Sequence, residues 1–190
     1  MILFSAHADT NFRRHRLRDL GDGWVEGHLD NFGGVHAVML AYFSGRLDNG
    51  FTRIELTEGE EDDMAGARRV VRQLKKRDTV FVVDVTGTPT ERDFVIEECA
   101  DPELTAFVQA ALAGLSYDLY AHCPDPIAQE SETWVYRRRC RRTCFLGLPC
   151  VGGDYNAGPV RTRRASLTAL AEAIGRLAQA YREATIRNRA

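Results

Sequence analysis

The chain has 190 residues, of which 44% are hydrophobic and 27% charged, and its formal net charge is −2. This composition is typical of a soluble globular protein and predicts one domain over residues 1–190, while the charge argues against nucleic acid or an anionic membrane as a partner. The N-terminus lacks a signal-peptide pattern and no apolar run approaches the ~20 residues of a membrane span, so we expect a cytoplasmic protein.

The first apolar run, residues 1–6, predicts a buried central strand that leads directly into His7, Ala8 and Asp9. Residues 11–22 are polar and basic, which indicates a surface excursion. A helix is predicted to begin just after Asp30, with apolar residues at helical spacing. Two glycines at its head, Gly33 and Gly34, would let the backbone approach a neighbouring element closely.

Residues 51–56 alternate between apolar and polar and predict a second strand, and residues 63–76 predict a helix with one apolar face. Between these two elements lies a run of acidic residues, 60–63. Such a run at a helix start can simply complement the helix dipole and cap exposed N–H groups.

The second half of the chain continues the alternation of strands and helices. The segment 124–143 is patterned too weakly for an assignment. Strands are predicted at residues 78–86, 94–96, 119–123 and 145–151, and helices at 102–115 and over the C-terminal segment, where Ser166 is expected to be the N-cap.

Buried strands that alternate with amphipathic helices predict an α/β fold with three αβα layers, in which a mostly parallel mixed sheet has helices on both faces. Ligands of such sheets bind at the carboxyl ends of the strands. Acidic residues and one histidine fall at such ends or just before a helix: His7, Asp9, Asp30, Glu60, Glu61 and Asp84.

This set offers the nitrogen and oxygen ligands that zinc, cobalt and manganese prefer. All its members except His7 are carboxylates. Carboxylates brought together repel one another unless a cation neutralises them, so a metal site is physically more reasonable than an empty one.

The same residues resemble a family. The segments at 5–10, 29–35, 60–67 and 83–86 are similar, in this order and on matching elements, to those of the co-catalytic di-zinc aminopeptidases and their amidohydrolase relatives, which include bacterial leucyl-type and glutamyl-type enzymes. The resemblance covers nearly the whole chain. It implies a zinc-exopeptidase-like fold and a hydrolase that cleaves the amide bond of a peptide or an N-acyl amino acid with metal-activated water.

Carried over by position, the resemblance implies that His7 and Asp84 hold one zinc ion, that Asp30 bridges two ions and that Glu61 binds the second. Cobalt or manganese could replace zinc.

The remaining roles also follow from the resemblance. Asp9 would accept a hydrogen bond from the imidazole of His7, and Glu60 would be the general base. The family supplies its last ligand as a histidine before the final helix, and here the matching place offers Asn156, a poor zinc ligand. His122, after a predicted strand, could replace it.

The family usually has further structure before the strand that ends in His7. We therefore expect either a minimal version or a second copy of the chain that covers the exposed strand edge. A non-catalytic or single-metal relative that acts as a binding or assembly module is the alternative to an enzyme.

Other readings remain open for the second half of the chain. The arginine-rich residues 137–142 could grip phosphate or a substrate carboxylate, or form a solvated edge or partner contact. His15, His28 and His36 are most simply surface or capping residues. The odd number of cysteines favours reduced thiols, although a structural zinc could be held by His122, Cys123, Cys140, Cys144 and Cys150.

Overall fold

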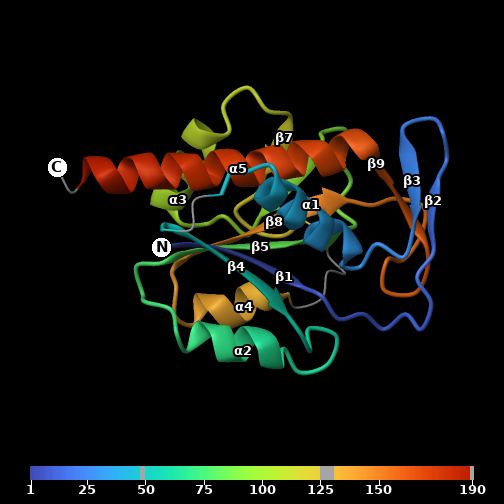
Figure 1. Cartoon of the computed structure of the whole chain (residues 1–190), viewed down its shortest axis with the longest axis horizontal. Coiled ribbons are helices and arrows are strands. Elements are labelled where there is room, and N and C mark those ends of the chain that lie inside the picture. The colour runs from blue at the N-terminus through green and yellow to red at the C-terminus, as the bar shows by residue number, and fades with distance from the viewer. Residues whose placement is uncertain (48–49, 125–130, 189–190) are drawn as a thin grey trace.

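The computed structural model describes residues 1–47, 50–124 and 131–188, and Figure 1 shows the arrangement of its elements. The strands are β1 (Ile2–His7), β2 (Leu17–Asp19), β3 (Trp24–Gly27), β4 (Thr52–Thr57), β5 (Thr79–Thr86), β6 (Phe94–Glu97), β7 (Tyr117–Leu119), β8 (Arg142–Pro149) and β9 (Val160–Arg163). The helices are α1 (Phe32–Phe43), α2 (Ala65–Val71), α3 (Pro102–Ala111), α4 (Glu132–Arg137) and α5 (Arg164–Arg187).

The main sheet has six strands in the order β4-β1-β5-β8-β6-β7. β1 pairs in parallel with β4 and β5, and β5 pairs in parallel with β8, so these strands end on the same side of the sheet. β6 runs antiparallel to β8 and has β7 parallel beside it. The prediction of a mixed, mostly parallel sheet is confirmed.

Helices cover both faces of the main sheet, as predicted (Figure 1). Side chains alternate along a strand, so neighbours such as Leu3 and Phe4 enter different cores. Phe4 and Phe81 lie in the larger core with α1, α3 and α5, and their rings stack with centroids 5.6 Å apart. Leu3 and Val82 lie in the smaller core with α2 and α4.

Several predicted boundaries differ from the structure. The helix predicted at 63–76 is the shorter α2, because Met64 has a left-handed φ of 57° and Asp63 accepts a hydrogen bond from the backbone N–H of Ala65. The helix predicted at 102–115 is α3, which ends at Ala111. The strand predicted at 119–123 was placed too late, because β7 pairs with β6 only over Tyr117–Leu119.

The predicted start of the last helix was also wrong. α5 begins at Arg164, directly after β9, and Ser166 is buried within its first turn rather than being the N-cap. Arg163 occupies the N-cap position without a side-chain cap.

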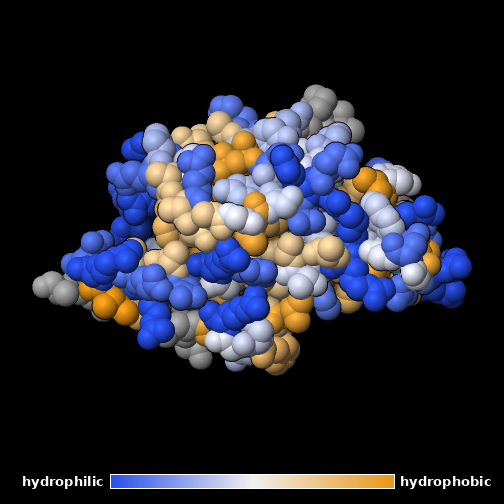
Figure 2. All heavy atoms as spheres, turned by 90° about the horizontal axis from the view of Figure 1, so that it is seen from above, coloured by the Kyte–Doolittle hydropathy of each residue, from blue (hydrophilic) through white to orange (hydrophobic). Residues whose placement is uncertain are grey.

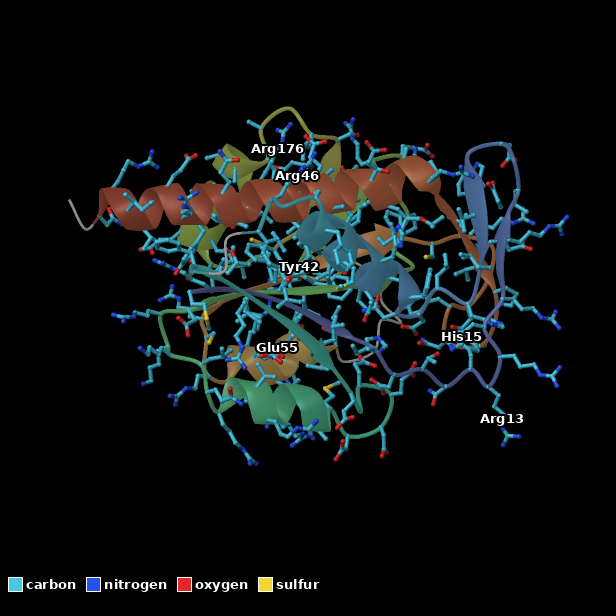
Figure 3. All side chains as sticks on the ribbon, viewed as in Figure 1. Arg13, His15, Tyr42, Arg46, Glu55 and Arg176 are labelled. Atoms are coloured by element: carbon cyan, nitrogen blue, oxygen red, sulfur yellow. The ribbon has the colours of Figure 1, made fainter. Side chains whose placement is uncertain are left out.

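Two further features were not predicted. α4 lies in the weakly patterned segment, of which residues 125–130 are outside the described part of the chain. The surface excursion after β1 carries β2, which joins β3 and β9 in a separate antiparallel sheet. Arg13 and His15 lie on this excursion, beside the small sheet and away from the main one (Figure 3), and both are exposed.

None of the described helices is long and apolar enough to cross a lipid bilayer. The side of the molecule on which α5 lies shows hydrophilic residues interspersed with apolar ones (Figure 2). Near the end of α1, Leu40, Tyr42 and Phe43 are exposed although they are apolar or aromatic.

Candidate metal centre

The carboxyl ends of two neighbouring strands and the start of one helix meet at a single point. His7 is the last residue of β1, and Asp84 lies near the end of β5, which pairs with β1 in parallel. Asp30 precedes α1 and is joined to the N-cap residue Asn31 by a cis peptide bond. The fold therefore brings together three residues from distant parts of the sequence.

The close approach of α1 to β5 depends on a glycine. A Cβ atom on Gly34 would lie 2.6 Å from the carbonyl oxygen of Val83 and 2.2 Å from Asn31 Oδ1. The Asn31 amide donates a hydrogen bond to this Val83 oxygen (2.8 Å) and its Oδ1 accepts one from the N–H of Gly34. This contact holds Asp30 at the strand ends.

His7, Asp30 and Asp84 form a tight, buried cluster. His7 Nε2 lies 3.1 Å from Asp30 Oδ1 and 3.2 Å from Asp84 Oδ2. Two ligand atoms on a tetrahedral zinc, each bound at 2.0–2.2 Å, are about 3.3 Å apart. Among the described residues this is the one group of His, Cys, Asp and Glu side chains close enough to hold a metal ion. Its donor set and spacing fit zinc.

The cluster also fixes the protonation of His7 when no cation is present. Burial disfavours the imidazolium, but the carboxylates of Asp84 and Asp30 outweigh this effect and raise the pKa of His7 to about 12. Burial raises the pKa of Asp30 above its ordinary value, against the opposing effect of His7. The metal-free cluster is therefore held together by a proton on the imidazole.

Asp9 lies beside His7 in a different way from that implied by the resemblance. The backbone carbonyl oxygen of Asp9 is 3.1 Å from His7 Nδ1, within hydrogen-bonding distance, whereas its carboxylate Oδ1 is 3.7 Å away. This Oδ1 is buried and has no hydrogen-bond partner in the part of the chain that the structure describes. The main-chain carbonyl of Asp9 thus accepts from the Nδ1–H of His7 and leaves Nε2 facing the two aspartates.

The loop between β4 and α2 carries Glu60 and Glu61. It is held against α2 at Gly66, whose N–H donates to the Glu58 carbonyl (2.8 Å) and whose absent Cβ would lie 2.6 Å from that oxygen. Burial, followed by repulsion from Asp84, raises the pKa of Glu60 to about 8.

Glu61 is half-buried like Glu60 and accepts a hydrogen bond from Asn11 Nδ2 (2.6 Å). Burial also raises the pKa of Glu61. Glu61 lines the same cavity as Asp30 and Asp84, which has a volume of about 570 Å³. It stands apart from the tight cluster of His7 and the two aspartates.

The structure places Asn156 at the rim of this cavity, where it lines the wall and is exposed. His122 is exposed and is not among the residues that line the cavity. Among the described residues, neither Glu61 nor His122 belongs to a group of His, Cys, Asp and Glu side chains that is close enough to hold a metal ion.

No protein-family model matches the sequence, and no curated protein matches it. Solved structures do share its fold. PhTET1-12s, a dodecamer, has a TM-score of 0.70 and 16% identity over 87% of this chain and 53% of its own. An M18-family aminopeptidase from Thermotoga maritima has a TM-score of 0.66 and 14% identity over 86% of this chain and 48% of its own. The aminopeptidase APDkam598 from the archaeon Desulfurococcus kamchatkensis has a TM-score of 0.67 and 12% identity over 85% of this chain and 50% of its own. The chain has an aminopeptidase-like fold. It spans about half the length of these proteins.

Sequence reasoning missed a buried glutamate close to the cluster of His7, Asp30 and Asp84. Glu132 is 1% exposed and accepts hydrogen bonds from Ser5 Oγ (2.9 Å) and Thr57 Oγ1 (2.5 Å), while the hydroxyl of Tyr136 lies 2.9 Å from Ser5 Oγ. Burial raises the pKa of Glu132. It ties α4 to β1 and β4 close to His7, and the weak pattern around residue 132 gave no signal of this role.

A second missed residue, Glu97, could have been found. It ends β6, is 3% exposed and lines the cavity. An acid at the end of a buried apolar run was a signal in the sequence, although β6 runs antiparallel to β8, so its end does not share the edge at which β1 and β5 end.

Among the described residues, the cysteines do not gather into a metal site. Cys140 lies in the smaller core, whereas Cys144 and Cys150 lie in the larger one on the other side of the sheet, which agrees with thiols rather than a shared zinc ion. The arginines have partners within the protein: Arg141 is 2.8 Å from Asp101, and Arg139 donates to the Leu74 carbonyl.

The three other histidines also lie outside the metal cluster. His28 stacks on Phe12 with ring centroids 4.2 Å apart, and His36 stacks on Phe32. His15 is exposed on the surface excursion.

Proposed function

We propose that the protein is a metal-dependent hydrolase that cleaves an amide bond at the end of a peptide or in an N-acyl amino acid. The observation that carries the proposal is the buried cluster of His7, Asp30 and Asp84, with Glu60 beside it on the wall of the cavity. Zinc is the ion that its donors suit best, with cobalt or manganese as substitutes.

The residues divide the work between binding and proton transfer. A divalent cation bound by His7, Asp30 and Asp84 supplies Lewis acidity, which polarises a carbonyl group and makes a water more acidic. Glu60 takes the proton of the attacking water and returns it to the leaving amine. Burial raises the pKa of Glu60 to about 8, and a cation nearby would favour its ionised form, which is the form that accepts the proton of water.

The test compares Glu60→Gln with Glu58→Gln, a change in the same loop at an exposed residue that pairs with Arg69. Purified protein is loaded with zinc, cobalt or manganese, its metal content is measured, and a panel of aminoacyl chromogenic amides is supplied. Glu60→Gln should keep its metal and lose about 100-fold or more in kcat, the usual scale of general acid–base catalysis. Glu58→Gln should match the wild type. Full activity in Glu60→Gln would refute the role.

A second candidate function is a non-catalytic or single-metal module for binding or assembly. It is favoured by the exposed Asn156 at the place where an imidazole would be needed beside Glu61. Counting the zinc equivalents bound by apo protein separates the two. One tight equivalent without hydrolysis supports the module, whereas two equivalents with hydrolysis support a two-metal enzyme.

We also propose that the chain forms homo-oligomers. PhTET1-12s is a dodecamer, and β4 is an edge strand of the main sheet here. An open strand edge can pair with another chain. Light scattering during size-exclusion chromatography should give a mass above that of one chain, and a monomer at all concentrations would refute the proposal.

A further inference from the structure

The cavity that Asp30 and Asp84 line has a second group of acidic residues on its wall. This part of the lining comprises Thr86, Glu97, Glu98 and Phe145, together with Ser131 next to α4. No Lys, Arg or His is among the described residues that line the cavity. A cation held by the aspartates would therefore still leave negative charge on the cavity wall at Glu97 and Glu98.

The two glutamates in this part of the lining differ in how their charge is balanced. Glu98 forms an ion pair with Arg137 (3.4 Å) and accepts a hydrogen bond from Thr133. Glu97 accepts a hydrogen bond from the hydroxyl of Thr86 (3.0 Å) and forms no ion pair with any described residue. Residues 125–130, outside the described part, contain no basic side chain.

Among the buried carboxylates, Glu97 and Glu132 have no cationic partner in the described part of the chain, and of these two only Glu97 lines the cavity. Asp30 and Asp84 face the imidazole of His7, and Asp78 accepts from the N-terminal ammonium group (3.1 Å). Glu97 is 3% exposed and has only a neutral donor. A buried carboxylate without a cationic partner is costly, and the cost is offset when a cationic ligand supplies the partner.

We propose that Glu97 makes the cavity selective for substrates whose N-terminal residue has a cationic side chain, above all lysine. This inference rests on the proposed function, because it assigns the substrate class of the same site. The walls suit such a side chain, since Met64, Val85 and Phe145 offer apolar surface beside the aliphatic stem while the ammonium group reaches Glu97.

The contact between Thr86 and Glu97 depends on Gly147 of β8. A Cβ atom there would lie 2.6 Å from Thr86 Cγ2 and 2.7 Å from Val95 Cγ2. The missing side chain lets Thr86 reach across β8 to Glu97, which fixes the carboxylate at the cavity wall. The position of the charge is therefore built into the sheet.

The first test measures kcat/KM for the lysyl and norleucyl amides of the same fluorogenic amine, using zinc-loaded protein. The two side chains share an aliphatic stem, and only lysine ends in an ammonium group. We expect the lysyl amide to be favoured by about 10- to 100-fold, the range of a charge-assisted hydrogen bond in a site shielded from water. Glu97→Gln, which can still accept from Thr86, should bring the ratio near one, while Glu98→Gln should keep it.

The second test measures binding of lysinamide and norleucinamide by calorimetry, with and without zinc, so that it does not depend on turnover. Preference for lysinamide that is lost in Glu97→Gln supports the inference, whether or not any amide is hydrolysed. If no amide is hydrolysed, the proposed function is refuted while the role of Glu97 in binding stands. Equal binding of the two amides by the wild type overturns the inference. Equal weakening of both in Glu97→Gln also overturns it, because Glu97 would then hold the α-ammonium group.

Discussion

Metal binding should compete with the proton on His7, and the competition can be measured. The pKa of His7 is about 12 in the metal-free cluster, so the imidazole is protonated throughout the neutral range. A cation can bind its nitrogen only after this proton leaves, and each proton displaced changes the affinity by about tenfold per pH unit. From His7 alone, the affinity for zinc should therefore rise by about 100-fold from about pH 6 to about pH 8, and this is the least that we expect of the wild type.

Glu60 can add to this slope. Its pKa of about 8 keeps it largely protonated over the same range, and a nearby cation favours its ionised form. The wild type should then release between about one and two protons per ion, and Glu60→Gln should release about one.

Calorimetry in buffers of different ionisation enthalpy counts these protons directly, and the chelator used as competitor is corrected for its own protonation. An affinity for zinc that is the same at both pH values would refute the reasoning. It would mean that His7 is neutral in the metal-free protein or that it does not bind the ion.

Further predictions concern the stability of the metal-free protein. Gly34→Ala should lower the free energy of unfolding by about 2 kcal/mol or more in urea titrations, because the Cβ atom of the alanine would lie 2.2 Å from Asn31 Oδ1. The control Gly158→Ala should leave this free energy unchanged, because a Cβ atom there has nothing within 4 Å. Glu132→Ala should cost about 3 kcal/mol in the same assay, since it leaves two buried hydroxyl groups without their acceptor, and a loss below about 1 kcal/mol would contradict the buried network. Thermal unfolding should show a midpoint that falls from about pH 5 to about pH 8, because the cluster histidine and Glu60 both have raised pKa values and hold protons that the unfolded chain releases. Glu60→Gln should make this fall shallower, and a midpoint that rises over the range would contradict the assigned pKa directions.

Much of the fold follows from local sequence pattern. β1 and β5 are buried along their whole length, so their apolar runs predicted central strands without knowledge of their neighbours. α4 and the small sheet of β2, β3 and β9 were missed because their stability comes from tertiary contact. Every residue of β2 is exposed, and α4 is only six residues long.

The site shows the same division. The strand-end rule picked out His7 and Asp84, and the parallel pairing of β1 and β5 brought them together. The pattern gave no distance between side chains, so it could not show that the carbonyl of Asp9 rather than its carboxylate faces His7. The sequence pattern also could not show which acidic side chains have no basic partner in the folded protein, and for this reason Glu97 was not predicted as a site residue.

The assembly of the cluster from separate elements has a consequence for how the protein would hold and lose an ion. His7 and Asp30 are 23 residues apart, and Asp84 follows in another strand. An unfolded chain would have to close long loops to gather these ligands, so it would bind the ion weakly. A bound ion would thus act as a cross-link between β1, α1 and β5. A chelator would lower the free energy of unfolding, because it would remove an ion that binds the native state in preference to the unfolded chain.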